Sequence, residues 1–478
     1  MPHPSSHRPG LFIVGFLLTI LALLGIAYAF FLDRNDPLIV LSPATSTVSK
    51  ALELTLEVKD QGMGIALIRV EARRKDSIPI KLLEKNFLPP KPTIIERFTL
   101  AGLPWKSGEI TLEVTARDAS WAKFFRGNKS VVLRELTLDN TPPMLSVINC
   151  TTNVRQGSAA VVAFTANEEL TITGVRVNDI FYPAFRQKKG NYLSLFAFPW
   201  NLSAREFQPV LFGRDIAGNE REMHLTMHTL PANFRHDTIN LSDSFLDRKM
   251  PEFEKDVSGT MSNIDRYLQV NNKLRNANAK TIAELGWRTA AKPLWQGPFQ
   301  RFTGKLMANF ADTRTYRYNG KDVDTQTHLG VDIASQKNIE VSAANYGIVV
   351  QADWLGIYGQ TVIIDHGLGL QSLYSHLSEI MVKKDDEVQK GQTIGRTGTT
   401  GLAGGDHLHF GILISGLAVS PTEWWDPHWI KDNLADCIPD IRPCTTDNQT
   451  TINNKAKNEP TKARGKSHPS KKLGDKKY

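Results

Sequence analysis

Cysteine is scarce in this chain, and its placement limits what it can do. Only three cysteines occur among 478 residues. None follows the apolar run near the N-terminus, which argues against a lipoprotein anchor. Cys437 and Cys444 flank a short loop that contains proline, and they would pair in an oxidising compartment, leaving Cys150 over. Three unpaired thiols are the alternative.

The main body of the chain also lacks an excess of charge of one sign. The formal net charge is +8, but nine Lys/Arg and two acidic residues in 455–478 account for +7 of it. About one positive charge is left for everything else, which argues against a basic groove and against nucleic acid as a partner. With 41% hydrophobic and 22% charged residues, the chain can bury several cores, and its length suggests about three domains.

One long uncharged run stands near the N-terminus. Residues 11–32 carry no charge, and 22 residues can cross the roughly 30 Å hydrocarbon core of a bilayer. Arg8 before the run favours a cytoplasmic position for residues 1–10 and a single-pass signal anchor in the cytoplasmic membrane. A cleaved signal peptide is the alternative, since Ala27-Tyr28-Ala29 resembles a cleavage site. Either reading predicts that the bulk of the chain is periplasmic or extracytoplasmic, in the cell envelope.

Two β-rich regions are expected next. Residues 52–58 (LELTLEV) alternate apolar and polar side chains, as a half-buried strand does, and similar segments recur over 37–138. The linker 139–143 (DNTPP) ends that region because two prolines cannot continue a central strand. A second such region covers 142–230. We predict two tandem immunoglobulin-like β-sandwiches, which resemble the modules of bacterial surface proteins.

The rest of the chain changes character three times. Apolar residues at helical spacing after Ser242 predict a helical connector over 240–290 that packs on a neighbouring domain; a partner-binding amphipathic helix is the alternative. Glycine-punctuated strands predict a β domain over 295–430. Residues 445–478 are polar and basic, which predicts disorder. This tail is either simply solvated or attracted to anionic envelope polymers or lipid headgroups.

Histidine and aspartate in the third of these regions have the spacing of a metal site. His328 and Asp332 are separated by three residues, with Gly330 between them permitting the backbone to curve. His407 and His409 alternate on a predicted strand, so both imidazoles point to the same face. Zinc accepts imidazole and carboxylate donors, and a hydrolytic site uses three protein ligands and leaves one position for water.

Other histidines of the chain fit this set less well or differently. His376 stands at a predicted strand end, in Tyr374-Ser375-His376-Leu377. His366 precedes a glycine in a turn, for which we expect a structural role. His224 and His228 have ligand-like spacing but no acidic partner nearby, and we expect them to lie on the surface or to pack.

These motifs together resemble the lysostaphin/LytM-type murein metallopeptidases, which carry His-x3-Asp, a Tyr-x-His-Leu element and a terminal His-x-His. The resemblance covers about 300–425. It implies a small, mostly antiparallel β domain that acts on the peptide part of peptidoglycan. It also implies that His328, Asp332 and His409 bind one zinc ion and that His376 and His407 are the two catalytic histidines. The family often has Phe-Gly-x-Arg before the first histidine, where this chain has Phe310-Ala311-Asp312-Thr313 followed by Arg314.

The fold expected is therefore mainly β, and the function expected is that of a membrane-anchored zinc endopeptidase of cell-wall peptides. In such a site a neutral imidazole accepts the proton of the attacking water and returns it to the leaving amine. One alternative is a non-catalytic regulator that keeps the fold and activates a separate hydrolase. Another is an adhesin or structural protein dominated by its β modules, which would leave five convergent polar positions unexplained.

Overall fold

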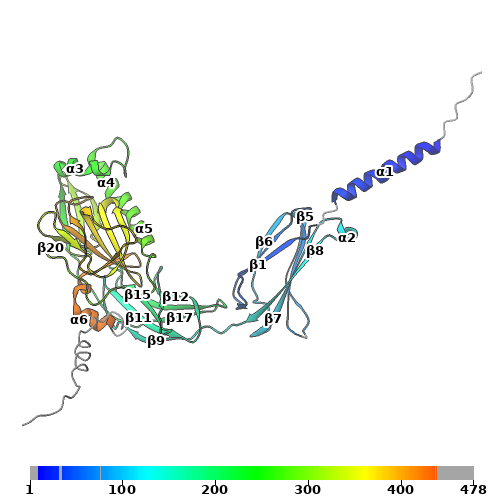
Figure 1. Ribbon diagram of the computed structural model, residues 1–478, viewed down its shortest axis with the longest axis horizontal. Coiled ribbons are helices and arrows are strands. Elements are labelled where there is room, and N and C mark those ends of the chain that lie inside the picture. The colour runs from blue at the N-terminus through cyan, green and yellow to red at the C-terminus, as the bar shows by residue number, and fades with distance from the viewer. Residues whose placement is uncertain (1–8, 32–34, 76, 436–437, 439–478) are drawn as a thin grey trace, which may run out of the picture.

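The computed structural model describes residues 9–31, 35–75, 77–435 and 438. It confirms a mainly β protein with few helices, shown in Figure 1. The cytoplasmic segment predicted over 1–10 falls largely outside these ranges. Both the proposed Cys437–Cys444 pair and the predicted disordered tail over 445–478 lie outside them, and stay predictions.

The segment at the predicted membrane span is helical. Helix α1 covers Pro9–Phe31. Within the described ranges, however, no helix combines the length and the apolar character needed to cross a membrane. The structure therefore does not support the transmembrane anchor predicted over 11–32.

The first β unit consists of two sheets packed on each other. One has the order β1-β3-β6 and the other β2-β8-β7-β4-β5. Their elements are β1 (Leu38–Ser42), β2 (Thr47–Val48), β3 (Leu54–Lys59), β4 (Ile65–Arg73), β5 (Ile80–Lys91), β6 (Thr93–Phe98), β7 (Gly108–Asp118), the short helix α2 (Ala122–Phe125) and β8 (Lys129–Leu138). In β3 every second residue from Leu54 is buried, as its alternating sequence predicts.

The second β unit also has two main sheets, of order β14-β15-β11-β9 and β13-β12-β16-β17. A short pair, β10-β18, runs beside them. The strands are β9 (Leu145–Cys150), β10 (Asn153–Arg155), β11 (Ala159–Ala166), β12 (Leu170–Val177), β13 (Ile180–Pro183), β14 (Phe185–Arg186), β15 (Tyr192–Ala197), β16 (Pro209–Asp215), β17 (Glu220–His224) and β18 (His228–Leu230). The immunoglobulin-like assignment of both units stays a prediction.

A ten-stranded, largely antiparallel sheet forms the C-terminal domain. Its main path is β20-β23-β30-β27-β26-β25-β28. The strands are β20 (Lys305–Ala308), β23 (Val331–Ala334), β24 (Glu340–Ser342), β25 (Gly347–Trp354), β26 (Gln360–Gly367), β27 (Leu370–Ile380), β28 (Glu387–Val388), β29 (Thr393–Thr397), β30 (Leu408–Ile414) and β31 (Leu417–Val419). Short helical turns are η3 (Gly356–Tyr358), η4 (Thr422–Trp425), α6 (Pro427–Ile430) and η5 (Lys431–Ala435).

A helical segment and a small sheet lie against this domain. The segment comprises α3 (Asp243–Lys249), η1 (Met250–Phe253), α4 (Asn263–Gln269), η2 (Val270–Leu274) and α5 (Arg275–Leu285). The sheet joins β19 (His236–Leu241), β21 (Thr313–Tyr318) and β22 (Lys321–Thr327). Ser242 and Ser262 cap α3 and α4 by accepting hydrogen bonds from backbone N–H groups. Figure 1 shows α3 and α4 at the top of the C-terminal domain and α5 along its right-hand side.

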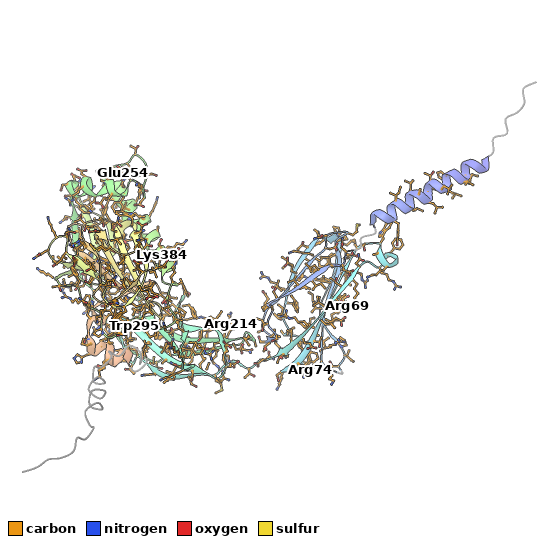
Figure 2. The ribbon with its side chains drawn as sticks, in the orientation of Figure 1. Arg69, Arg74, Arg214, Glu254, Trp295 and Lys384 are labelled. Atoms are coloured by element: carbon orange, nitrogen blue, oxygen red, sulfur yellow. The ribbon has the colours of Figure 1, made fainter. Side chains whose placement is uncertain are left out.

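In the part of the chain that the structure describes, the buried apolar side chains form three cores, whose boundaries are not those of the units. The first β unit has a core of its own. The second unit shares one continuous core with the C-terminal domain, which includes the fully buried Trp295, labelled in Figure 2 at the base of that domain. The helical segment forms the third core with Tyr316 and Ile357. The second unit is therefore fixed to the C-terminal domain by buried apolar surface.

Candidate metal and catalytic site

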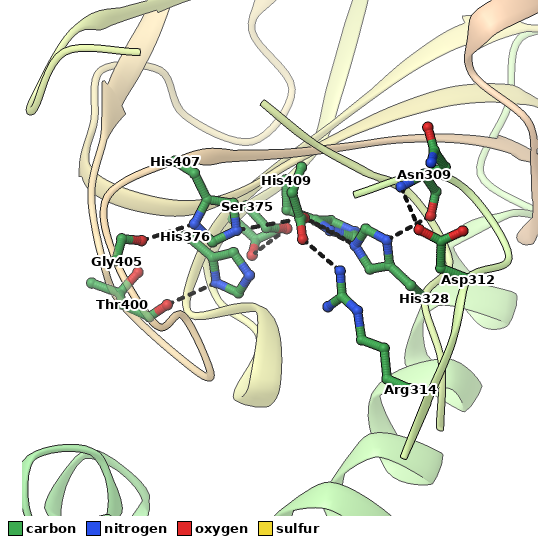
Figure 3. Close-up of polar contacts among 12 residues, drawn as sticks. Asn309, Asp312, Arg314, His328, Ser375, His376, Thr400, Gly405, His407 and His409 are labelled. Carbon is green, nitrogen blue, oxygen red and sulfur yellow. Dashed lines mark hydrogen bonds and ion pairs between the residues drawn. The ribbon is translucent and has the colours of Figure 1, made fainter. Parts of the chain in front are cut away.

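The three predicted ligands converge on one point, and Figure 3 labels two of them, His328 and His409. The Nε2 atom of His328 lies 2.9 Å from Oδ1 of Asp332 and 3.0 Å from Nδ1 of His409. The third side of the triangle, from Nδ1 of His409 to Oδ1 of Asp332, is 3.0 Å. In a tetrahedral site with bonds of about 2.0–2.1 Å, neighbouring donors are roughly 3.3 Å apart. The three side chains therefore fit a zinc-sized ion after shifts of a few tenths of an ångström.

Strand pairing explains why residues about eighty positions apart meet. β23 runs antiparallel to β30, and Asp332 is directly opposite His409 in the register. Gly330 is needed for space, because a Cβ atom there would lie 2.5 Å from Nε2 of His409. The chain also bends at Gly330, as the sequence suggested, so the glycine meets two requirements at once. The side chain of His409 fills the space that any larger side chain at position 330 would need.

Hydrogen bonds fix the tautomer and the charge of the ligands. Nδ1 of His328 is 2.9 Å from the carbonyl of Asn309, to which it donates, so Nε2 keeps its lone pair for a metal. Arg314 donates to Oδ2 of Asp332 at 2.8 Å and leaves Oδ1 facing the histidines. Burial opposes ionisation of Asp332, but the histidines around it outweigh this and hold its pKa well below the ordinary value. Arg314, one place later than the family pattern has it, thus orients a ligand.

The other two predicted histidines flank the triangle. Nδ1 of His376 lies 2.8 Å from the carbonyl of Thr400, and Nδ1 of His407 lies 2.8 Å from that of Gly405. Both therefore present Nε2 to the site, and their ring centres are 4.9 Å apart. Nε2 of His407 is 3.5 Å from Oδ1 of Asp332. His376 has φ +62°, a conformation uncommon outside glycine, within the irregular part of β27.

Burial lowers the pKa of each of these imidazoles, but their neighbours make the net shifts differ in direction. Desolvation, with the neighbouring His407 and His409, lowers the pKa of His376 well below its ordinary value, so the ring is neutral near pH 7. For His407 desolvation also opposes the charge, but the hydrogen bond and charge of Asp332 outweigh it and raise the pKa. Desolvation lowers the pKa of His409 to about 4, which leaves it neutral and able to bind metal.

The remaining histidines lie away from this site. His366 is fully buried, between the carbonyl of Tyr346 and the hydroxyl of Ser372, and desolvation lowers its pKa to about 4. His224 and His228 are exposed on β17 and β18. These positions agree with the structural role expected for His366 and the surface positions expected for His224 and His228.

A cavity of about 330 Å³ opens beside the metal triangle. One wall holds the five site residues, and the opposite wall comes from β19, β21 and the helical segment. Its lining also includes Ile239, Asn240, Leu241, Phe245, Tyr267, Arg275, Arg314, Tyr316, Ile357, Tyr358, Leu402 and Gly404. The sequence did not show that the helical segment takes part in the site, because helical spacing reports only that one face is buried and not against what.

The same helical segment holds the loop that orients His376. Lys249, which is 2% exposed, donates to the carbonyl of Thr399 and pairs with Glu252 at 2.7 Å. Glu252 in turn accepts the backbone N–H of Gly401 at 3.0 Å. Between these two anchors lies Thr400, whose carbonyl accepts from His376. The position of His376 therefore depends on a contact between segments about 150 residues apart.

Comparison with known proteins decides the kind of domain. Residues 326–421 match the model of Peptidase family M23. All five site residues fall within this range. The lysostaphin/LytM-type resemblance of the C-terminal domain is confirmed, and the match covers about a fifth of the chain.

Curated relatives match over the same region. An uncharacterized metalloprotease of Haemophilus influenzae is 32% identical over 146 residues, or 30% of this chain and 30% of that protein. The peptidoglycan DD-endopeptidase ShyA of Vibrio cholerae is 33% identical over 129 residues, 26% of this chain and 29% of ShyA. The murein hydrolase activator EnvC of Escherichia coli is 38% identical over 95 residues, 20% of this chain and 23% of EnvC. The chain thus matches less than a third of the length of each relative.

Proposed function

We propose that this protein is a zinc-dependent endopeptidase of the cell envelope that hydrolyses peptide bonds in the stem or cross-bridge peptides of peptidoglycan. One observation carries the proposal: three ligand-type donors converge within 3.0 Å of one another, with two further imidazoles facing the same cavity. The match to Peptidase family M23 and the similarity to a DD-endopeptidase support it.

In this proposal His328, Asp332 and His409 hold the zinc ion. When bound there, zinc supplies a Lewis acid that polarises the peptide carbonyl and acidifies water. Arg314 keeps Asp332 turned toward the ion by holding its other oxygen. The carbonyl of Asn309 keeps His328 in the tautomer that binds metal.

The two other histidines handle protons. His376, kept neutral by burial, accepts a proton at Nε2 from the attacking water and passes it to the leaving amine. His407, whose pKa is raised, donates a hydrogen bond to the oxyanion that develops on the carbonyl. The aromatic and aliphatic side chains that also line the cavity lower the local dielectric constant and strengthen both interactions.

The runner-up is a non-catalytic regulator of another cell-wall hydrolase, as the printed name of the EnvC relative suggests for that protein. All three ligand positions and both catalytic positions are filled here, which favours the enzyme. The two functions separate cleanly by experiment: a regulator would form no product from any muropeptide even when loaded with zinc.

The test uses the full chain, because the C-terminal domain shares its core with the second β unit. We expect about one zinc per chain by elemental analysis and cleaved products by mass spectrometry of defined muropeptides. His409→Ala should lose both zinc and turnover. His376→Ala should keep zinc but lower kcat by roughly 100-fold to 10,000-fold, the range typical of a general acid–base group.

The matched control is His224→Ala, which removes an exposed imidazole outside the site and should change neither readout. Turnover that persists in the double variant His328→Ala/His409→Ala would refute the zinc assignment. Normal zinc content without product would establish the regulator.

A further inference from the structure

We propose that Arg275 binds a free carboxylate of the substrate peptide beside the scissile bond, so that the enzyme prefers stem peptides whose carboxyl groups are not amidated. This inference rests on the proposed function and adds a determinant of specificity to it. It comes from the wall that the helical segment contributes to the cavity.

The charges around the cavity are unequal. Its lining contains two guanidinium groups, Arg275 and Arg314, and one carboxylate, Asp332. Arg314 is already paired with Asp332 at 2.8 Å. Among the described residues no carboxylate forms an ion pair with Arg275, so its guanidinium has no carboxylate partner in the cavity wall. Most other lining side chains are apolar or aromatic, so an anion that enters is poorly screened from this charge.

Arg275 is held in place by its neighbours. Its Nε donates to the carbonyl of Asn271 at 3.2 Å, and Nη2 donates to the side-chain oxygen of Asn271 at 2.6 Å. Asn271 is fully buried and donates to Asp324 at 2.7 Å. Asp324 is not part of the cavity wall. The guanidinium is therefore fixed before a ligand arrives, which reduces the entropy lost on binding.

Arg275 lies close enough to the metal triangle for one peptide to reach both. Arg275, Tyr358 and the three ligands line the same cavity, and the ring centre of Tyr358 lies 5.6 Å from that of His409. A carboxylate on the residue next to the cleaved bond, or at the end of the peptide, would meet Arg275 while the bond lies at the triangle.

Peptidoglycan stem peptides carry both kinds of carboxylate, and both can be replaced by carboxamides that differ by one charge and almost nothing in shape. The experiment compares, with zinc-loaded full chain, the kcat/KM for a muropeptide with free carboxyl groups, the same peptide amidated on a side-chain carboxyl, and the same peptide amidated at its C-terminus. We expect a fall of roughly 10-fold to 100-fold for one amidated form, the value of one charged hydrogen-bonded contact. The affected form identifies which carboxylate is bound.

Two variants assign the effect to Arg275. Arg275→Met keeps the length of the side chain and should cleave the acid and the amide at equal, low rates, whereas Arg275→Lys should regain part of the preference. The control is Arg317→Met, which also removes one guanidinium charge. Arg317 lies on β21 outside the cavity, in an exposed ion pair with Asp322. This variant should keep the full preference of the native chain.

The outcomes distinguish a failure of the Arg275 inference from a failure of the proposed function. Equal cleavage of acid and amides by the native chain would overturn the inference while leaving the endopeptidase intact, and needs no variant. A preference that survives in Arg275→Met would place recognition on another group and would also overturn it. Absence of product from every peptide would instead contradict the proposed function itself.

Discussion

The two β units look alike in sequence pattern, yet the structure uses them differently. The first unit closes its core between its own two sheets and touches the second through few groups, such as the backbone bond from Ser49 to Ala217 at 2.7 Å. The second unit continues its core into the C-terminal domain, and Ser420 donates to the carbonyl of Gly157 across that boundary. A repeated sandwich pattern therefore does not tell whether a unit is a spacer or part of the body that carries the site.

Truncation should give the largest difference between the units. A chain that starts at residue 142 should fold and cleave muropeptides like the full protein. A chain that starts at residue 236 would expose the shared core. Its free energy of unfolding should fall by more than the 5–15 kcal/mol that stabilises a typical domain. Circular dichroism, thermal melting and turnover measure this. Unchanged melting of the shorter chain would refute the shared core.

Substitutions that each create one cavity in a core should show the same contrast between the two units, with smaller effects. Phe198→Ala, in the second unit, should cost about 3–5 kcal/mol and lower the stability of the C-terminal domain with it. Leu56→Ala, in the first unit, should cost about 2–5 kcal/mol but leave turnover unchanged at temperatures where the first unit has melted. Turnover followed through the melt distinguishes the two. Loss of activity in step with the first unit would contradict the separation.

The boundary between the second unit and the C-terminal domain should respond to pH. Glu423 accepts the Ser158 hydroxyl there, and burial raises its pKa to about 7. Because the folded pKa is above the unfolded value, the stabilisation is present below about pH 4.5 and is lost as pH rises through 7. The effect is at most about 3 kcal/mol. Urea unfolding from pH 5 to 8.5 should show this fall in the native chain.

Glu423→Gln supplies the control, since an amide does not titrate. The difference in unfolding free energy between the native chain and this variant should change with pH in the sense just given. A difference that is constant from pH 5 to 8.5 would show that Glu423 ionises normally.

Ion pairs should give the smallest effects, and again unequal ones. Lys249→Met removes a buried ammonium from the contact that positions His376, and should cost about 1.5–3 kcal/mol and lower kcat more than it raises KM. Arg97→Ala breaks an exposed pair with Glu53 in the first unit and should change stability by less than about 1 kcal/mol, without effect on turnover. Equal losses of kcat in the two variants would contradict the role given to Lys249.

The sequence by itself determined the chemistry of the site. The motifs His-x3-Asp and His-x-His identify the candidate metal-binding side chains. The period of two along a strand places His407 and His409 on one face without any tertiary information. Alternation also predicted the mainly β fold, because a strand with one buried face must alternate. The length of the apolar run alone predicted a membrane span, which the structure does not support.

Only the tertiary structure decided what surrounds those donors. Arg314 was visible in the sequence, but its bond to Asp332 follows from the sheet β19-β21-β22 lying over the cavity. Helical spacing predicted helices over 240–290, yet the contacts of Lys249 with Thr399 and of Arg275 with the cavity join segments far apart in the chain. Periodicity reports that a face is buried but not which partner buries it, since that choice depends on the shape and charge of surfaces formed elsewhere in the chain.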